Sequence, residues 1–224
     1  MHTKQARRNI DVKIVHHPTH KDSIRCAKEL QGLLPFESDL HVGPTRDSLP
    51  RNDYKIVDWR ELDTVHTKPH PVLLGNMLAC FYAHYTIWEK ITENTLIFED
   101  DARPVPNISL EISALEDFDG DLLNLGRPIF VGKETSRRAW LEMKDKTRKG
   151  VCRRKVKNSF LYGAHAYLLT PKGASKLIAS TNNGTLLRPN DMVCNNKDID
   201  IYDYCPYPFR QERDLRETIM LDGV

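Results

Sequence analysis

The chain has 224 residues, 40% of them hydrophobic and 29% charged, which suits one globular domain with a core of its own. No stretch approaches the roughly 20 apolar residues of a membrane helix, and the basic residues 1–9 lack the apolar run of a secretory signal. The five cysteines form no CxxC pair, which disfavours a disulfide framework or a structural zinc site and favours reduced thiols. We therefore predict a single cytoplasmic domain over residues 1–224.

Hydrophobic spacing predicts an alternation of strands and helices, which is typical of an α/β fold. Alternating or short apolar runs predict strands at 11–15, 39–42, 95–98, 121–125, 164–169 and 199–202. Apolar residues three and four positions apart predict helices at 23–34, 73–91 and 171–178. Residues 44–71 are expected to form a long surface connection with one strand or turn, and 212–224 a charged tail that is helical or partly disordered.

Three acidic residues, Glu99, Asp100 and Asp101, follow directly after the apolar run 95–98. Ligands collect at the C-terminal ends of strands in open α/β sheets. Adjacent carboxylates repel one another and are costly to desolvate, and a divalent cation offsets both effects. Because Mg²⁺ and Mn²⁺ take oxygen ligands and leave positions for phosphate, the triplet predicts a metal site for a nucleoside-diphosphate leaving group. The alternative is a solvated acidic turn.

Residues 133–157 form a basic segment. They hold eleven Lys and Arg against three Asp and Glu, a net +8, so the rest of a chain of total charge +2 carries −6. One interpretation is a solvated or disordered insertion, as charge runs usually are. The other is a surface that binds a polyanion, such as nucleic acid, an anionic lipid surface or a phosphorylated saccharide.

Several ordered blocks of the chain resemble glycosyltransferase family 25, which includes lipopolysaccharide and collagen galactosyltransferases. The matching blocks are 75–90 with His84 and Trp88, 95–102 with the acidic triplet, 121–126, 162–177, 188–191 and 201–211. The resemblance covers roughly residues 11–211, is strongest over 75–177, and allows a phage or viral member. The chain departs from the family at 16–19, which read His-His-Pro-Thr, and 127–158 has no match.

The resemblance implies a GT-A fold, that is, a single α/β domain with a mixed, mostly parallel sheet flanked by helices. It implies an inverting enzyme that uses Mn²⁺ or Mg²⁺ to move a hexose or similar sugar from a UDP-sugar to an acceptor hydroxyl. The expected acceptor is a saccharide, and the charge of 133–157 keeps hydroxymethylated bases of phage DNA as an alternative. Rivals of other classes are an inert binding module for nucleotide sugars or nucleic acid, and a nuclease with further acids at Asp119, Asp121, Asp198 and Asp200.

The resemblance also implies roles for individual residues. Asp101 is the first choice for metal contact and Asp100 the second, while Glu99 orients the motif or the sugar. Asp191 is the candidate general base, with helix capping as the alternative. His165 is a metal ligand, a donor contact or a structural residue, and His84 is either a donor contact or a core histidine. The full set predicted to bind the donor is His16, His17, Arg25, Gly75, His84, Asp100 and Gly163. For His16 and His17 the alternative is a plain turn.

Overall fold

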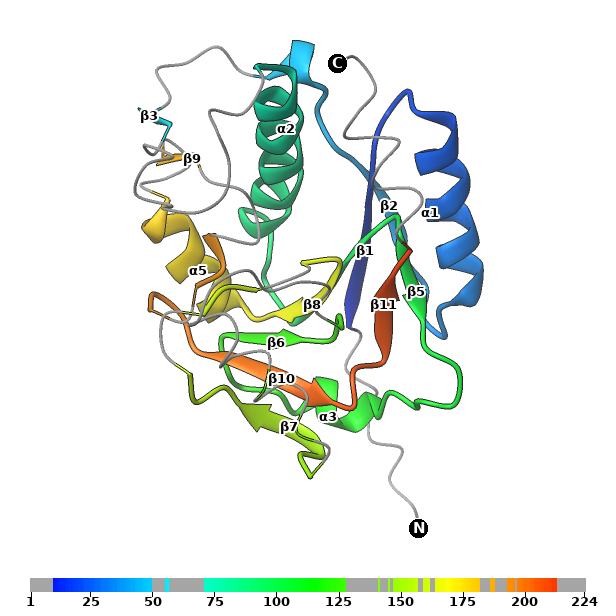
Figure 1. Ribbon diagram of the computed structural model, residues 1–224, viewed down its shortest axis with the longest axis vertical. Helices are drawn as coiled ribbons and strands as arrows, with labels where there is room; N and C mark the ends of the chain where they lie inside the picture. The colour runs from blue at the N-terminus through cyan, green and yellow to red at the C-terminus, as the bar shows by residue number, and fades with distance from the viewer. Residues whose placement is uncertain are drawn as a thin grey trace.

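The computed structural model describes residues 10–49, 55–56, 71–127, 141, 145, 147–156, 159–161, 164–181, 186–187, 193–195 and 197–212. Its main sheet has seven strands in the order β2-β1-β4-β8-β6-β10-β7 (Figure 1). Their bounds are β1 (Asp11–His16), β2 (Asp39–Val42), β4 (Thr95–Glu99), β6 (Leu122–Asn124), β7 (Gly150–Arg153), β8 (Ala166–Leu169) and β10 (Ile201–Cys205). Two small sheets pair β5 (Ala102–Pro104) with β11 (Phe209–Gln211), and β3 (Lys55–Ile56) with β9 (Leu186–Leu187).

Helices cover both faces of the main sheet. They are α1 (Lys21–Leu33), α2 (Pro71–Trp88), the short α3 (Ile112–Glu116) and α5 (Pro171–Ser180), with a 3₁₀ turn η1 (Arg46–Ser48). Figure 1 shows α1 on one side of the sheet and α2 with α5 on the other. Among the described helices, none combines the length and the apolar character needed to cross a membrane.

Five of the seven strands are parallel. Strands β2 and β4 both run parallel to β1, β10 runs parallel to β6, and β8 is antiparallel to both β4 and β6. Strands β2, β1, β4, β6 and β10 therefore all end at one edge of the sheet, and the predicted α/β fold with a mixed, mostly parallel sheet is confirmed. The acidic triplet lies at this edge, because Glu99 is the last residue of β4.

Side-chain alternation along β4 divides the core into two layers. Leu96 and Phe98 pack with Ala27 and Leu30 of α1, while Ile97 packs with residues of α2 and α5. Such burial on both faces is typical of strands covered by helices on each side, and it explains the continuous apolar run before the triplet. The same alternation sends the next side chain on the Ile97 face, that of Glu99, towards α2.

Nearly all predicted elements are present with small shifts at their ends. The strand expected at 199–202 is β10, but it is not the last one, because β11 follows it. Strands β5, β7, β9 and β11 and helix α3 were not predicted. They are short, and β7 has half-buried and exposed residues in alternation with no apolar side. Hydrophobic periodicity carries little signal in such segments.

The basic segment 133–157 is partly built into the sheet. Its residues 150–153 form β7, the edge strand that pairs antiparallel with β10. Arg154 is buried and donates from Nε to Oδ2 of Asp203 at 3.1 Å, and Arg148 Nη1 lies 3.5 Å from the same oxygen. The interpretation of this segment as a disordered insertion is therefore wrong for residues 150–154, although of these only Arg154 is buried; most of 133–149 lies outside the described residues.

Candidate functional site

The three acids at the end of β4 point to three different elements. Glu99 faces α2, where its Oε1 lies 3.4 Å from Nε2 of His84. Asp100 accepts a hydrogen bond from Ser23 in the first turn of α1. Asp101 accepts through Oδ2 from Nε2 of Gln211 in β11, at 2.6 Å. The triplet is thus a junction between three parts of the fold rather than a solvated turn.

Asp100 is a buried carboxyl group whose charged form is costly. Its side chain is 9% exposed, and its Oδ2 has no hydrogen-bond partner within the described part of the chain. Burial raises the pKa of Asp100 from 3.8 to about 6; the hydrogen bond from Ser23 opposes the rise and the charge of Glu99 adds to it. A carboxylate that is costly to ionise and has an unused oxygen fits a divalent cation, which would offset that cost.

The loop after β1 is organised around His17. Its Nδ1 accepts the backbone N–H groups of residues 19–20 at 3.3 and 3.2 Å, so the ring proton sits on Nε2. Burial lowers the pKa of His17, and the two neighbouring histidines lower it further, which keeps the ring neutral. The backbone N–H of His17 donates to Oγ of Ser23 at 2.8 Å, and Ser23 in turn reaches Asp100. His16 and His17 therefore form an ordered turn beside the triplet, and their contact with a donor stays a prediction.

A buried polar network lies behind Glu99. Nε1–H of Trp88 donates to the Tyr167 hydroxyl at 3.0 Å, and Nδ1 of His84 lies 2.8 Å from the same oxygen. His84 is fully buried, as the core-histidine alternative requires, yet its Nε2 faces Oε1 of Glu99. Burial raises the pKa of Tyr167 well above 10, so the phenol stays protonated and holds the His84 ring in place.

Tyr167→Phe is expected to lower the free energy of unfolding by about 2–3 kcal/mol. The change leaves the Trp88 indole N–H and His84 Nδ1 buried without their shared partner, and each buried polar group left unsatisfied costs about 1–3 kcal/mol. Urea unfolding measures the effect. Tyr202→Phe is the control, because the ring of Tyr202 packs on Phe118 and the side chain is only half-buried. An equal cost for both variants would contradict the role given to the network.

Of four other predicted site residues, the structure describes two. His165 is buried at the start of β8, and its carbonyl oxygen accepts the Glu99 N–H at 2.9 Å, which brings it beside the triplet. Gly75 is buried within α2. Asp191 and Gly163 lie outside the described residues, so their roles stay predictions.

Arg25 is engaged on the surface of its own helix. Its guanidinium lies 3.2 Å from Asp22 and 2.8 Å from Glu29, three and four residues away. Neighbours at this spacing share a helix face, so both partners compete with any ligand for the same donors. The predicted donor contact of Arg25 therefore has no support from its position and stays a prediction.

One group of side chains has the arrangement of a metal site. Within the described residues, a single set of three His, Cys, Asp or Glu side chains has ligand atoms all within 4.8 Å of one another, and its members are Cys80, His84 and Glu99. We name this set the α2–β4 cluster. The predicted ligands Asp101, Asp100 and His165 do not form such a set, because the two aspartates contact different elements. Their metal role stays a prediction; Oδ2 of Asp100 and Oδ1 of Asp101 are both buried and without a hydrogen-bond partner among the described residues.

The acids that a nuclease would need lie elsewhere. Asp121 and Asp200 directly precede β6 and β10, so they lie at the edge opposite to the acidic triplet. Asp121 is also held by Lys172 and by Lys176, both of α5, and accepts the Asp200 backbone N–H at 2.8 Å. The topology therefore separates these acids from the triplet, and the nuclease alternative fails.

Sequence reasoning missed several contributors to the site. Cys80 stands four residues before His84, one turn apart on the same helix face, and this spacing was an available signal. Ser23 and Tyr167 gave no local signal, because their partners are far away in the sequence. Gln211 closes the last block of the family resemblance, but nothing in the chain indicated that it meets Asp101.

Residues 70–194 match the model of a family described as Glycosyltransferase family 25 (LPS biosynthesis protein). The match covers more than half of the chain and includes α2, the acidic triplet, β8 and α5. No curated protein matches the chain.

Proposed function

The chain belongs to glycosyltransferase family 25, and from this we propose that it moves a hexose or similar sugar from a UDP-sugar to an acceptor hydroxyl with inversion. One observation carries the proposal: Asp100 is a buried carboxylate with an unused oxygen, at the sheet edge where the parallel strands end. This edge is where open α/β sheets bind nucleotides.

The residues present fit a divalent cation. Asp100, with Asp101 as its predicted companion, would hold Mn²⁺ or Mg²⁺, which keep water and phosphate oxygens in their other positions. When bound, the ion supplies positive charge that neutralises the diphosphate leaving group. Ser23 fixes the Asp100 carboxylate and Gln211 fixes that of Asp101, so both acids are held in place before a donor arrives.

The protein's own groups supply the remaining steps. In the proposed reaction Asp191 removes the proton of the acceptor hydroxyl, as predicted from the family resemblance. The loop at 16–20 ends beside Asp100 and is the proposed seat of the uridine moiety. Its backbone N–H groups are partly used by His17 and Ser23, which makes the loop rigid rather than adaptable.

We propose a saccharide as the acceptor. The DNA alternative rested on the +8 charge of 133–157. Three arginines of that segment, Arg148, Arg153 and Arg154, form ion pairs with Asp200 or Asp203 of the same domain. The two carboxylates offset two of these three positive charges, and no observation in the described part of the chain favours DNA.

Thermal unfolding with UDP and Mn²⁺ tests the proposal. We expect UDP and Mn²⁺ together to raise Tm more than either alone, because a ligand at 100 times its Kd stabilises by about 2.7 kcal/mol. UDP-sugar hydrolysis should likewise require the ion. CMP, which has no diphosphate to bridge, is the matched control. If no nucleoside diphosphate shifts Tm with Mn²⁺ or Mg²⁺ and no donor is hydrolysed, the proposal is wrong.

A further inference from the structure

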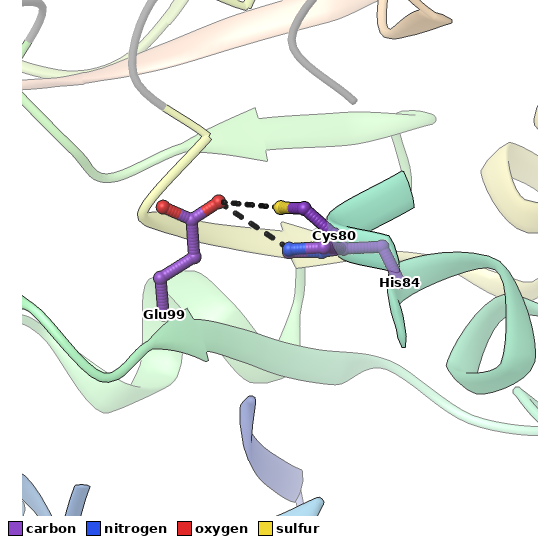
Figure 2. A group of neighbouring side chains, drawn as sticks. All are labelled: Cys80, His84 and Glu99. Atoms are coloured by element: carbon purple, nitrogen blue, oxygen red, sulfur yellow. Dashed lines mark hydrogen bonds and ion pairs between the residues drawn. The ribbon is translucent and has the colours of Figure 1, made fainter. Parts of the chain in front are cut away.

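The α2–β4 cluster joins three different ligand types at one point. Cys80 and His84 project from the same face of α2 towards the Glu99 side chain at the end of β4 (Figure 2). Both interactions end on the same oxygen: Oε1 of Glu99 is 3.9 Å from Sγ of Cys80 and 3.4 Å from Nε2 of His84. Nε2 of His84 is fully buried and lacks a hydrogen-bond partner within the described residues.

These distances suit a tetrahedral zinc ion. Zn²⁺ binds sulfur at about 2.3 Å and nitrogen or oxygen at about 2.0–2.1 Å, so tetrahedral angles separate the ligand atoms by about 3.3–3.6 Å. The nitrogen–oxygen separation already lies in this range at 3.4 Å, and the sulfur–oxygen separation of 3.9 Å needs only a small adjustment. We propose that Cys80, His84 and Glu99 form a zinc site, in which the described part of the chain supplies these three ligands.

The surroundings of His84 provide the support that a metal-bound imidazole needs. A metal-bound histidine nearly always donates its other ring N–H to a fixed acceptor. The Tyr167 oxygen lies 2.8 Å from Nδ1 of His84 and also accepts from Trp88, and its two lone pairs allow it to accept both N–H groups. This tautomer directs the lone pair of Nε2 at Glu99, into the centre of the cluster.

The ligand types separate this site from the proposed Mn²⁺ or Mg²⁺ site at Asp100. Thiolate and imidazole select zinc and similar borderline ions, whereas carboxylates and water select the harder ones. Binding releases one proton from the Cys80 thiol, because the thiolate is the ligand. A search for CxxC pairs does not find this set, since a single cysteine takes part. The ion would tie α2 to β4 directly beside the acidic triplet.

Cobalt and zinc titrations of the full chain test the proposal. We expect Co²⁺ to give a thiolate charge-transfer band, Zn²⁺ to remove that band by displacement, and Zn²⁺ alone to raise Tm. Cys80→Ser should abolish the band and weaken Zn²⁺ binding by about 100-fold or more, since even groups that only hydrogen-bond to the metal ligands contribute about 10- to 100-fold. Glu99→Gln should weaken binding as well. Cys152→Ser is the matched control, because Cys152 is also partly exposed but lies in β7, outside the cluster.

The outcomes are distinct. The proposal is overturned if the wild-type chain gives no thiolate band with Co²⁺, or if Cys80→Ser keeps the band and the zinc affinity. It is also overturned if Cys152→Ser loses them and Cys80→Ser does not. Circular dichroism identifies any variant that misfolds. If Cys80→Ser misfolds, the zinc affinity of Glu99→Gln tests the proposal in its place. Stabilisation by UDP with Mn²⁺ is measured in parallel, so a failure of the donor site is seen separately.

Discussion

Asp100→Asn should stabilise the metal-free protein at pH 7.5 by up to about 3 kcal/mol and remove its stabilisation by UDP with Mn²⁺. Burial is the largest cause that raises the pKa of Asp100 from 3.8 to about 6. At neutral pH the folded protein therefore holds a carboxylate that would be more favourably charged in the unfolded chain. Each unit by which the pKa of the folded chain exceeds that of the unfolded chain corresponds to about 1.4 kcal/mol of stability. The rise from 3.8 to about 6 therefore gives an effect of about 3 kcal/mol.

The pH dependence of the stability difference distinguishes burial of the Asp100 charge from other causes of stabilisation. Because the folded pKa lies above the unfolded one, the cost is fully present above about pH 6 and disappears as the pH falls towards 3.8. The stability advantage of Asp100→Asn should therefore shrink below pH 6 and vanish near pH 4. Urea unfolding at pH 7.5, 5 and 4 measures it, with the exposed Asp119→Asn as control. A variant that is less stable than wild type at pH 7.5 would contradict the argument.

The same substitution should cost about 100-fold or more in sugar transfer. An amide is a poor ligand for Mn²⁺ or Mg²⁺ compared with a carboxylate, and a catalytic cation contributes several kcal/mol to the stabilisation of the transition state. A loss of about 3 kcal/mol corresponds to about 100-fold in rate. Initial rates of UDP-sugar hydrolysis over a range of Mn²⁺ concentrations measure this effect. Unchanged rates at saturating Mn²⁺ would remove Asp100 from the cation site.

The position of the acidic triplet was predictable, but the directions of its side chains were not. The apolar run 95–98 and the helix with His84 follow from hydrophobic spacing, since both are buried and regular. The directions of Asp100 and Asp101 depend on the turn after β4 and on partners far along the chain. Gln211, which holds Asp101, is 110 residues away in sequence. Local patterns carry no information about such contacts.

The basic segment shows the opposite error, in which a strong sequence signal led to an incomplete interpretation. A count of charges does not distinguish exposed arginines from buried ones. The fold places Arg153 on the surface and buries its neighbour Arg154. The difference follows from strand alternation at the edge of the sheet and from Asp203 in the middle of β10, which needs a cation because it is itself buried. The pairing of β7 with β10 therefore decides which arginine charges of this segment stay exposed to a binding partner.

Arg154→Ala is expected to destabilise the protein by about 3–5 kcal/mol, whereas Arg153→Ala should cost little. Both side chains of the Arg154–Asp203 pair are 0% exposed, and removal of one partner leaves a buried charge without compensation. The Arg153–Asp200 pair has side chains that are 64% and 43% exposed, and exposed pairs contribute little. The two neighbours in one strand region thus form a matched test.

The pH dependence of this pair has the opposite sign to that of Asp100. Burial alone would raise the pKa of Asp203, but the adjacent Arg154 guanidinium outweighs it and holds the pKa below 3.8. Stability from the pair is therefore present above about pH 4 and lost as the pH falls through the lowered pKa. Arg154→Ala should accordingly lose more stability at pH 7 than at pH 4 in urea unfolding.

The double variant of Arg154→Met with Asp203→Asn should recover part of the loss, because it leaves neither partner of the pair charged. Equal costs for Arg153→Ala and Arg154→Ala would show that β7 does not anchor the basic segment in this way.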